Sequence, residues 1–183
     1  AGFVAMTAAL RQLAEECCDG RLVAVAEGGY DLKALGECYR AVIDGIHRRS
    51  KTIDILINNA GIAPAAPLEK TTDELWAKVM AVNVKAPFFL MQETVKVMKR
   101  EETHGSIVNI LSISAHGGQS FISPYCGSKG ALAIITKNAA HALRWDKIRV
   151  NGINMGWTYT DGEQLTQERD GKPGDWLAEA EKT

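Results

Sequence analysis

The sequence has no excess of either charge and no long apolar run. Lys and Arg total 21 against 22 Asp and Glu, for a formal net charge of -1. That balance argues against a nucleic-acid surface built on bulk positive charge. The most apolar stretches, residues 53–57, 87–91 and 131–135, fall far short of the roughly 18 residues that a membrane helix needs. We therefore predict neither nucleic-acid binding nor a membrane span.

Cysteine and histidine are sparse and follow no metal-binding pattern. The four cysteines include the adjacent pair Cys17 and Cys18 but no CxxC, and the four histidines show no i,i+4 pair. This lacks the spacing of zinc sites and of disulfide frameworks, so we predict no metal and a reducing, cytoplasmic setting. The sequence starts at Ala1 without the pattern of a signal peptide, and we expect a fragment or a fused piece of a longer protein.

The chain does contain enough apolar sequence for one folded domain. Its 183 residues are 46% hydrophobic and 23% charged, which is typical of a single globular domain with its own core. Short β-branched segments bounded by polar residues or glycine predict three buried strands, at residues 53–57, 106–111 and 148–153. Between them, helical periodicity predicts two long helices, at about residues 72–100 and 124–145.

Each long helix has a recognisable beginning. Residues 71–74, Thr-Thr-Asp-Glu, have the pattern of a capping box. An apolar series with a spacing of four follows: Trp76, Met80, Val84 and Phe88. Ser123 before Pro124 is the pattern of a cap residue followed by proline at the first helical position.

The remaining segments complete an alternating order of helices and strands. Residues 3–17 and 31–46 predict helices, and residues 21–26 predict a strand. Strands that alternate with helices long enough to cross over imply a parallel sheet covered on both faces. We therefore predict an α/β fold, a doubly wound parallel sheet of the Rossmann-like type. After Gly156 the pattern dissolves into a loop with a short helix, at the strand ends where such folds bind ligands.

A tyrosine and a lysine supply the chemistry that the sequence suggests. Tyr125 and Lys129 lie one helical turn apart, so the ammonium can lie close to the phenol. A free phenol has a pKa near 10, and a neighbouring cation lowers that pKa. Tyr125 would then act as a general acid or base near neutral pH. Ser112, at the end of the preceding strand, would hydrogen-bond the same substrate oxygen.

Asn83 carries a more specific hypothesis. Pro87 lies four residues later inside the helical pattern and has no N–H to donate to the backbone carbonyl of Asn83. That carbonyl is then free to hold a water. The alternative interpretation is that Pro87 merely kinks the helix.

Four motifs in a fixed order resemble the short-chain dehydrogenase/reductase family: Asn-Asn-Ala-Gly at residues 58–61, Asn83, Ser112, and Tyr-Cys-Gly-Ser-Lys at residues 125–129. The resemblance covers about residues 51–183. It implies reversible hydride transfer between NAD or NADP and a secondary alcohol or carbonyl compound. In this family the tyrosine is the acid/base, the lysine lowers its pKa, the serine orients the substrate and the asparagine holds a relay water.

The resemblance also implies a set of cofactor-binding residues: Asn58, Ala60, Gly61, Tyr125, Lys129, Gly156, Thr158 and Thr160. Met155 stands where the family has proline. Ser114 is a weaker candidate than Ser112, which has the family's spacing to the tyrosine. His116, Gln119 and residues 157–164 are expected to line the substrate pocket, and their polarity favours a hydroxylated or sugar-like small molecule. Neither the substrate itself nor the choice between NAD and NADP follows from the sequence.

The resemblance fails at the phosphate-binding turn. The family's TGxxxGxG is absent, and Gly28-Gly29 imitates the turn without its third glycine. The alternative function is therefore a catalytically inactive α/β fragment. We expect one incomplete domain, truncated at both ends, with its final helix and strand missing. Members of the family associate through two long helices, so a homo-oligomer through residues 72–100 and 124–145 is expected.

Two accounts of the origin of residues 1–46 compete, and the sequence favours the second. They are either the family's own helix-strand-helix unit or a foreign or fused segment. Residues 3–10 and 21–32 are similar to the C-terminal region of histone-deacetylase-like amidohydrolases, in which the tyrosine at the place of Tyr30 polarises an amide carbonyl. That chemistry needs a zinc held by Asp and His ligands, which the sequence lacks, so we predict no deacetylase activity.

Overall fold

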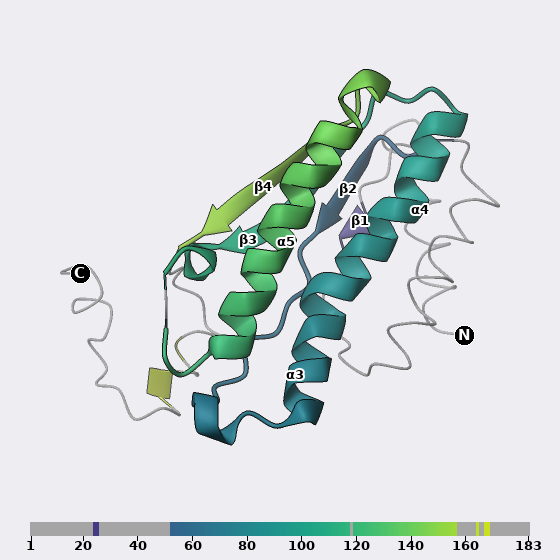
Figure 1. Cartoon of the computed structure of the whole chain (residues 1–183). Helices are drawn as coiled ribbons and strands as arrows, with labels where there is room; N and C mark the ends of the chain where they lie inside the picture. The colour runs from purple at the N-terminus through teal and green to yellow at the C-terminus, as the bar shows by residue number, and fades with distance from the viewer. Residues whose placement is uncertain (1–23, 26–51, 118, 157–163, 165–166, 169–183) are drawn as a thin grey trace.

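A parallel four-stranded sheet is the centre of the protein (Figure 1). The computed structural model describes residues 24–25, 52–117, 119–156, 164 and 167–168. All neighbouring strands are parallel, and their order is β1-β2-β3-β4. The strands are β1 (Ala24–Val25), β2 (Ile55–Asn58), β3 (Ser106–Ser112) and β4 (Arg149–Met155). The predicted α/β architecture with a parallel sheet is confirmed. β2, β3 and β4 begin and end within about two residues of the predicted strands, and β1 lies inside the strand predicted at residues 21–26.

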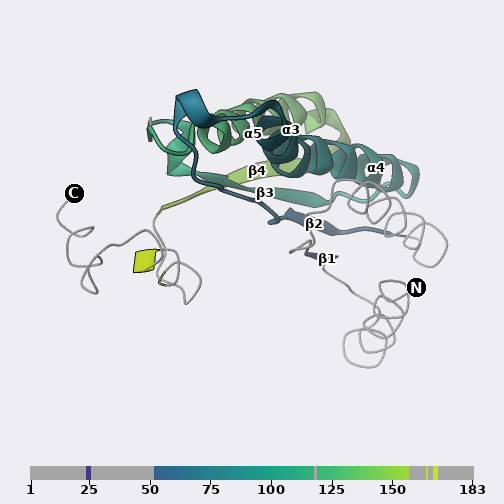
Figure 2. The ribbon, with the colours of Figure 1, turned by 90° about the horizontal axis from the view of Figure 1, so that it is seen from below.

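The described helices lie on one face of this sheet (Figure 2). The first long helix is continuous from α3 (Asp73–Met80) through a π-helical turn, η2 (Ala81–Lys85), to α4 (Ala86–Arg100). The second is α5 (Ser123–Ala142). Short 3-10 turns complete the described structure: η1 (Leu68–Lys70), η3 (Ile113–Ala115) and η4 (Arg144–Asp146). The predicted helices at residues 3–17 and 31–46, and Gly28-Gly29, lie outside the described residues.

Both helix beginnings differ in detail from the prediction. The N-cap of α3 is Thr72, whose Oγ1 accepts a hydrogen bond from the backbone N–H of Leu75 at 3.1 Å. Thr71, the expected cap, instead donates its hydroxyl to the carbonyl of Pro67 at 3.2 Å. In α5 the N-cap is Ile122, without a side-chain cap, so Ser123 is already the first helical residue. Adjacent hydroxyl residues compete for the same cap, and the path of the preceding loop decides between them.

The end of the second helix was also predicted too late. α5 ends at Ala142, and the chain continues into the 3-10 turn η4. Lys147 then adopts a left-handed conformation with φ 56, which reverses the chain into β4. The predicted helix to about Trp145 therefore overran by one turn, because α-helical and 3-10 turns share the same local sequence preferences.

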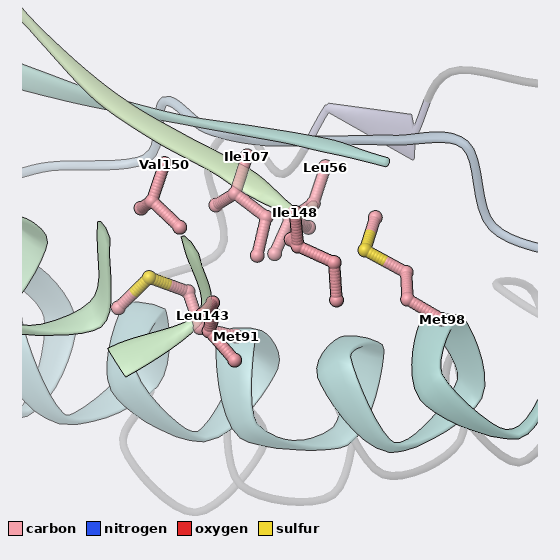
Figure 3. Packing of buried hydrophobic residues seen from close by; sticks show 7 residues of the cluster. All are labelled: Leu56, Met91, Met98, Ile107, Leu143, Ile148 and Val150. Atoms are coloured by element: carbon pink, nitrogen blue, oxygen red, sulfur yellow. The ribbon is translucent and has the colours of Figure 1, made fainter. Parts of the chain in front are cut away.

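The principal core cluster lies between the sheet and the helices (Figure 3). In Figure 3, apolar side chains from three strands face Met91 and Met98 of α4. The seven buried residues of the cluster are Leu56, Met91, Met98, Ile107, Leu143, Ile148 and Val150. This packing fixes α4 against β2 and β3, and thus supports the strand ends at which the candidate site lies.

The apolar series of the first long helix is not the face that the helix buries. Trp76 and Phe88 of the expected apolar series are 49% and 43% exposed, whereas Val79 and Val82 are buried. A π turn contains one more residue than an α turn, so the face that meets the sheet changes its phase along the helix. The spacing of four therefore predicted the helix, while other residues form the face that packs in the core.

The prediction that residues 148–153 form a buried strand was wrong for most of β4. In β4 only Val150 is buried. A strand is buried on both sides only where layers cover both faces of the sheet, and the described helices cover one face. In the described part of the chain, no helix is both long enough and apolar enough to pass through a membrane.

Candidate active site

The site forms at a step in the carboxyl edge of the sheet. Pairing between β2 and β3 ends where Asn58 meets Asn109, while β3 continues beside β4 as far as Ser112. β2 therefore provides no partner for the last residues of β3. The chain that leaves β2 passes through Gly61 at this step. Side chains of α5 reach the exposed flank of β3 there.

Lys129 occupies this step. Its Nζ donates a hydrogen bond to the backbone carbonyl of Ile110 at 2.7 Å, the residue just beyond the last β2–β3 pair. The same Nζ lies 5.7 Å from the centroid of the Tyr125 ring, so the ammonium lies beside the aromatic ring, as the spacing of one helical turn predicts. A Cβ at Gly61 would lie 3.4 Å from Lys129 Nζ and 3.6 Å from Asn83 Oδ1. Glycine at this position therefore lets the backbone after β2 pass close to the ammonium and to the Asn83 amide with no side chain between them.

Burial controls the charge of Lys129. The side chain is only 4% exposed, and desolvation lowers its pKa from 10.5 to about 8. Desolvation has this direction because a low-dielectric environment disfavours the charged form of an amine. At pH 7 the group is still mostly protonated, so a cation faces the tyrosine ring under neutral conditions.

This lowered pKa gives the stability of the fold a pH dependence that a Lys129→Met variant should lack. Above pH 8 the unfolded chain retains a lysine proton that the folded chain has lost, so the free energy of unfolding of the wild type rises between about pH 8 and 10.5. Below pH 8 the buried cation imposes its full cost. Urea unfolding should show the advantage of the variant over the wild type shrinking by on the order of 3 kcal/mol across that window. A constant difference would contradict the desolvated state of Lys129.

Asn83 joins three segments of the site. It is 0% exposed and lies in the π turn η2. Its Oδ1 accepts from the N–H of Ile62, and its Nδ2 donates to the carbonyl of Ile62, both at 2.9 Å. Nδ2 also donates to Ser128 Oγ at 2.9 Å, and Ser128 Oγ donates to the backbone carbonyl of Tyr125 at 2.7 Å. Asn83 thus ties the chain after β2 to the first turns of α5.

Ser112 lies at the end of β3 and belongs to a chain of hydrogen bonds. It is buried, with Oγ donating to Ser114 Oγ at 3.1 Å and accepting from the N–H of Ser114 at 3.2 Å. Ser114 Oγ donates in turn to Gln119 Oε1 at 3.3 Å. The structure therefore links Ser114, the weaker candidate, directly to Ser112, and connects both to one of the residues expected at the substrate pocket. His116, another of these, is exposed.

The remaining predicted residues are distributed around the same edge. Asn58 is buried at the end of β2, and Ala60 and Gly61 follow it half-buried. Gly156 is exposed just after β4. Thr158 and Thr160 lie outside the described residues, as do residues 157–163 of the expected pocket loop.

Sequence reasoning missed three contributors to this geometry. The Ile110 carbonyl is a backbone group and carries no sequence signal. Ser128 was overlooked inside the Tyr125–Lys129 motif, although a hydroxyl three residues after Tyr125 is placed to reach its carbonyl. Asn109 gave the clearest signal, because it is the polar residue in the middle of an otherwise apolar strand, Ile-Val-Asn-Ile-Leu.

Comparison with known proteins places this geometry in a family. The sequence pattern of the family described as short chain dehydrogenase matches residues 4–171. The chain belongs to the short-chain dehydrogenase family. The match begins at residue 4, and so extends over most of the segment for which the sequence favoured a foreign or fused origin.

Several curated members of the short-chain dehydrogenase family are similar to this chain. Galactitol 2-dehydrogenase of Agrobacterium fabrum is 37% identical over 123 residues, which are 67% of this chain and 47% of that protein. Gluconate 5-dehydrogenase of Gluconobacter oxydans is 38% identical over 141 residues, 75% of this chain and 54% of that protein. The chain thus spans about half the length of the curated relatives it matches.

Solved structures show the same likeness. A 4-hydroxyisoleucine dehydrogenase complexed with NADH matches with a TM-score of 0.71 and 28% identity, over 89% of this chain and 75% of that one. A gluconate 5-dehydrogenase from Burkholderia cenocepacia, in complex with NADP and tartrate, matches with a TM-score of 0.65 and 34% identity, over 69% and 49% of the two chains. The short-chain dehydrogenase fold is therefore shown by sequence and by structure.

Proposed function

We propose that this short-chain dehydrogenase is an NAD(P)-dependent oxidoreductase that interconverts a secondary alcohol and a carbonyl compound. The observation that carries the proposal is the buried Lys129 ammonium beside the Tyr125 ring. Burying a charged lysine costs free energy unless the charge is paired or hydrogen-bonded, and here the ammonium lies beside the ring of the residue that would exchange a proton with substrate. Family membership and relatives with bound NADH or NADP support the same proposal.

The residues at the step fit a polar, flat ligand such as a nicotinamide cofactor. Asn58 Oδ1 is buried and has no hydrogen-bond partner among the described residues, so an acceptor is available at the end of β2. Gly61 leaves the space above Lys129 free of a side chain. We propose that these residues, with Ala60, Tyr125 and Gly156, hold the cofactor, and that Thr158 and Thr160 complete the set. When bound, the nicotinamide supplies or accepts the hydride.

The side chains of the proposed site would transfer the proton that the reaction adds to, or removes from, the substrate oxygen. In carbonyl reduction the Tyr125 hydroxyl gives its proton to the substrate oxygen, and in alcohol oxidation it takes that proton. The Lys129 cation stabilises the phenolate form, and the Ser112 hydroxyl orients the substrate oxygen. We propose that the backbone carbonyl of Asn83 holds a water that carries the proton onward. The π turn around Asn83 and the missing N–H of Pro87 support this role, since π turns are frequent at functional sites.

We propose a polyhydroxylated small molecule as substrate. The polar chain from Ser112 through Ser114 to Gln119 supports this class, because hydroxyl and amide groups recognise substrate hydroxyls. The similar galactitol 2-dehydrogenase and gluconate 5-dehydrogenase are named for a sugar alcohol and a sugar acid. Relatives with NADH and with NADP both occur, so the proposal includes either cofactor.

Titration with NADH and with NADPH, followed by nicotinamide fluorescence, tests the proposed function. We expect saturable binding that Lys129→Ala weakens by about tenfold, since a buried charged donor contributes about 1.5–3 kcal/mol. Lys137→Ala is the matched control, because Lys137 is exposed on the same helix. Absence of binding up to millimolar cofactor would contradict the oxidoreductase and leave the inactive α/β fragment as the function.

Three further proposals concern the whole chain. Exposed Trp76, Phe88 and Ile134 on the long helices support a homo-oligomer formed through them. The free thiol of Cys126 is compatible with a reducing, cytoplasmic location.

The family match from residue 4 favours the family's own helix-strand-helix unit within a single domain. The resemblance of residues 1–46 to amidohydrolases stays a prediction, and we propose no deacetylase activity.

A further inference from the structure

A chain of buried hydrogen bonds runs from β2 through β3 to α5 at the level of Asn109, one residue before Ile110 of the candidate site. Asn58 Nδ2 donates to Asn109 Oδ1 at 2.7 Å. Asn109 Nδ2 donates to Thr136 Oγ1 at 2.8 Å, and Thr136 Oγ1 donates to the carbonyl of Leu132 at 2.7 Å. The three side chains are 4%, 0% and 4% exposed. They connect β2, β3 and α5, the three elements that carry the proposed site.

The direction of every bond in this chain is determined. The Leu132 carbonyl only accepts, so the Thr136 hydroxyl must donate to it and can only accept from Asn109. Asn109 therefore turns its amide nitrogen toward the helices, and its second hydrogen is donated to Met91 Sδ of α4 at 3.3 Å. Its Oδ1 then faces β2 and must accept from Asn58. Asn109 and Thr136 have no spare group, so a change at either leaves a buried partner unmatched.

The chain runs beside the groups that the proposed reaction uses. Asn109 immediately precedes Ile110, whose carbonyl accepts the hydrogen bond from Lys129. Thr136 follows Lys129 by seven residues, two turns along the same face of α5. α5 is therefore attached to β3 at two levels, once by Lys129 and once by Thr136. Two attachments define the position of a helix along a strand, whereas one alone would allow it to pivot.

We propose that Asn109 and Thr136 are positioning residues, which hold α5 against β3 so that Tyr125 and Lys129 lie beside the strand end that carries Ser112. The catalytic part of this inference rests on the proposed function. The attachment itself does not, because it predicts the placement of Lys129 in the protein without cofactor or substrate.

Thr136→Val tests the attachment. Valine keeps the shape and β-branching of threonine and removes the hydroxyl, so the buried amide of Asn109 loses its acceptor. Thr136→Ser keeps the hydroxyl. The matched control is Thr94→Val, the same change at a threonine that is 2% exposed on α4. The readout is the titration of Lys129 by NMR in protein labelled at lysine carbons, with the resonance assigned through Lys129→Met.

Release of α5 should admit water to Lys129. Among the described residues, the titratable side chain beside its ammonium is Tyr125 of the same helix, while the Ile110 carbonyl, Gly61 and the Asn83 amide beside it do not titrate. We expect Thr136→Val to raise the pKa of Lys129 from about 8 by about one unit. Thr136→Ser and Thr94→Val should leave it unchanged.

Turnover provides the second readout. The misplaced tyrosine should lower kcat of Thr136→Val about tenfold, with KM for cofactor changed less than about twofold and with recovery in Thr136→Ser. An unshifted Lys129 titration in Thr136→Val, or an equal shift in Thr94→Val, overturns the positioning role. An inactive wild type would instead overturn the proposed function, and the titration would still decide the attachment.

Discussion

Tyr125→Phe is expected to lower turnover by about 10²- to 10⁴-fold, the usual contribution of a general acid or base. Phenylalanine keeps the ring that lies 5.7 Å from Lys129 Nζ. It also keeps the backbone carbonyl that accepts from Ser128. The substitution therefore removes only the hydroxyl that would exchange a proton with substrate.

Steady-state kinetics with the substrate class proposed above measures the effect. Thermal unfolding should place the midpoint of the variant within a few degrees of the wild type, because no contact described for Tyr125 involves its hydroxyl in the folded core. Cofactor affinity from nicotinamide fluorescence should change by less than about threefold. Turnover equal to that of the wild type would remove Tyr125 from the role of acid and base.

Asn83→Leu should produce the largest loss of stability among single changes at the site. The side chain is fully buried and makes three hydrogen bonds, two to the backbone of Ile62 and one to Ser128. Leucine is of similar size but pairs with none of these groups. A buried polar group left without a partner costs roughly 1–3 kcal/mol, so we expect the free energy of unfolding to fall by about 3 kcal/mol or more.

Urea unfolding of Asn83→Leu and Asn138→Leu makes the comparison direct. Asn138 is exposed on α5, and its substitution should change the free energy of unfolding by no more than about 0.5 kcal/mol. A loss below about 1 kcal/mol in Asn83→Leu would show that the link between the chain after β2 and α5 contributes little. The size of the loss of unfolding free energy in Asn83→Leu therefore measures how much the hydrogen bonds of Asn83 contribute to the stability of the fold.

Local patterns in the sequence predicted the elements because each element follows local rules. The β-branched segments became β2, β3 and β4, and the position of Pro124 in the first turn of α5 agreed with its preference for helix starts. The spacing of Tyr125 and Lys129 predicted their juxtaposition for the same reason, since four residues make one turn. Each of these inferences depends only on neighbours along the chain.

The features that were missed or wrongly predicted depend on residues far apart in the sequence. No local rule indicates that β2 ends opposite Asn109, and so the bond from Lys129 to the Ile110 carbonyl was not foreseen. Whether Thr71 or Thr72 caps α3 depends on Pro67, which accepts the hydroxyl of the other. The π turn at Ala81–Lys85 was not foreseen in the first long helix. Tertiary structure decided these points, and a single sequence contains no direct signal for it.

The early end of β2 has a consequence for redesign of this protein. A β2 that paired with β3 for one more residue would extend the backbone ladder past Asn109 and compete with the lysine for the Ile110 carbonyl. The ammonium would then lose its anchor while every residue of the proposed site remained in place. A substitution that favours extended backbone at Asn59 would therefore remove this anchor of Lys129 by lengthening β2, without changing any residue of the proposed site.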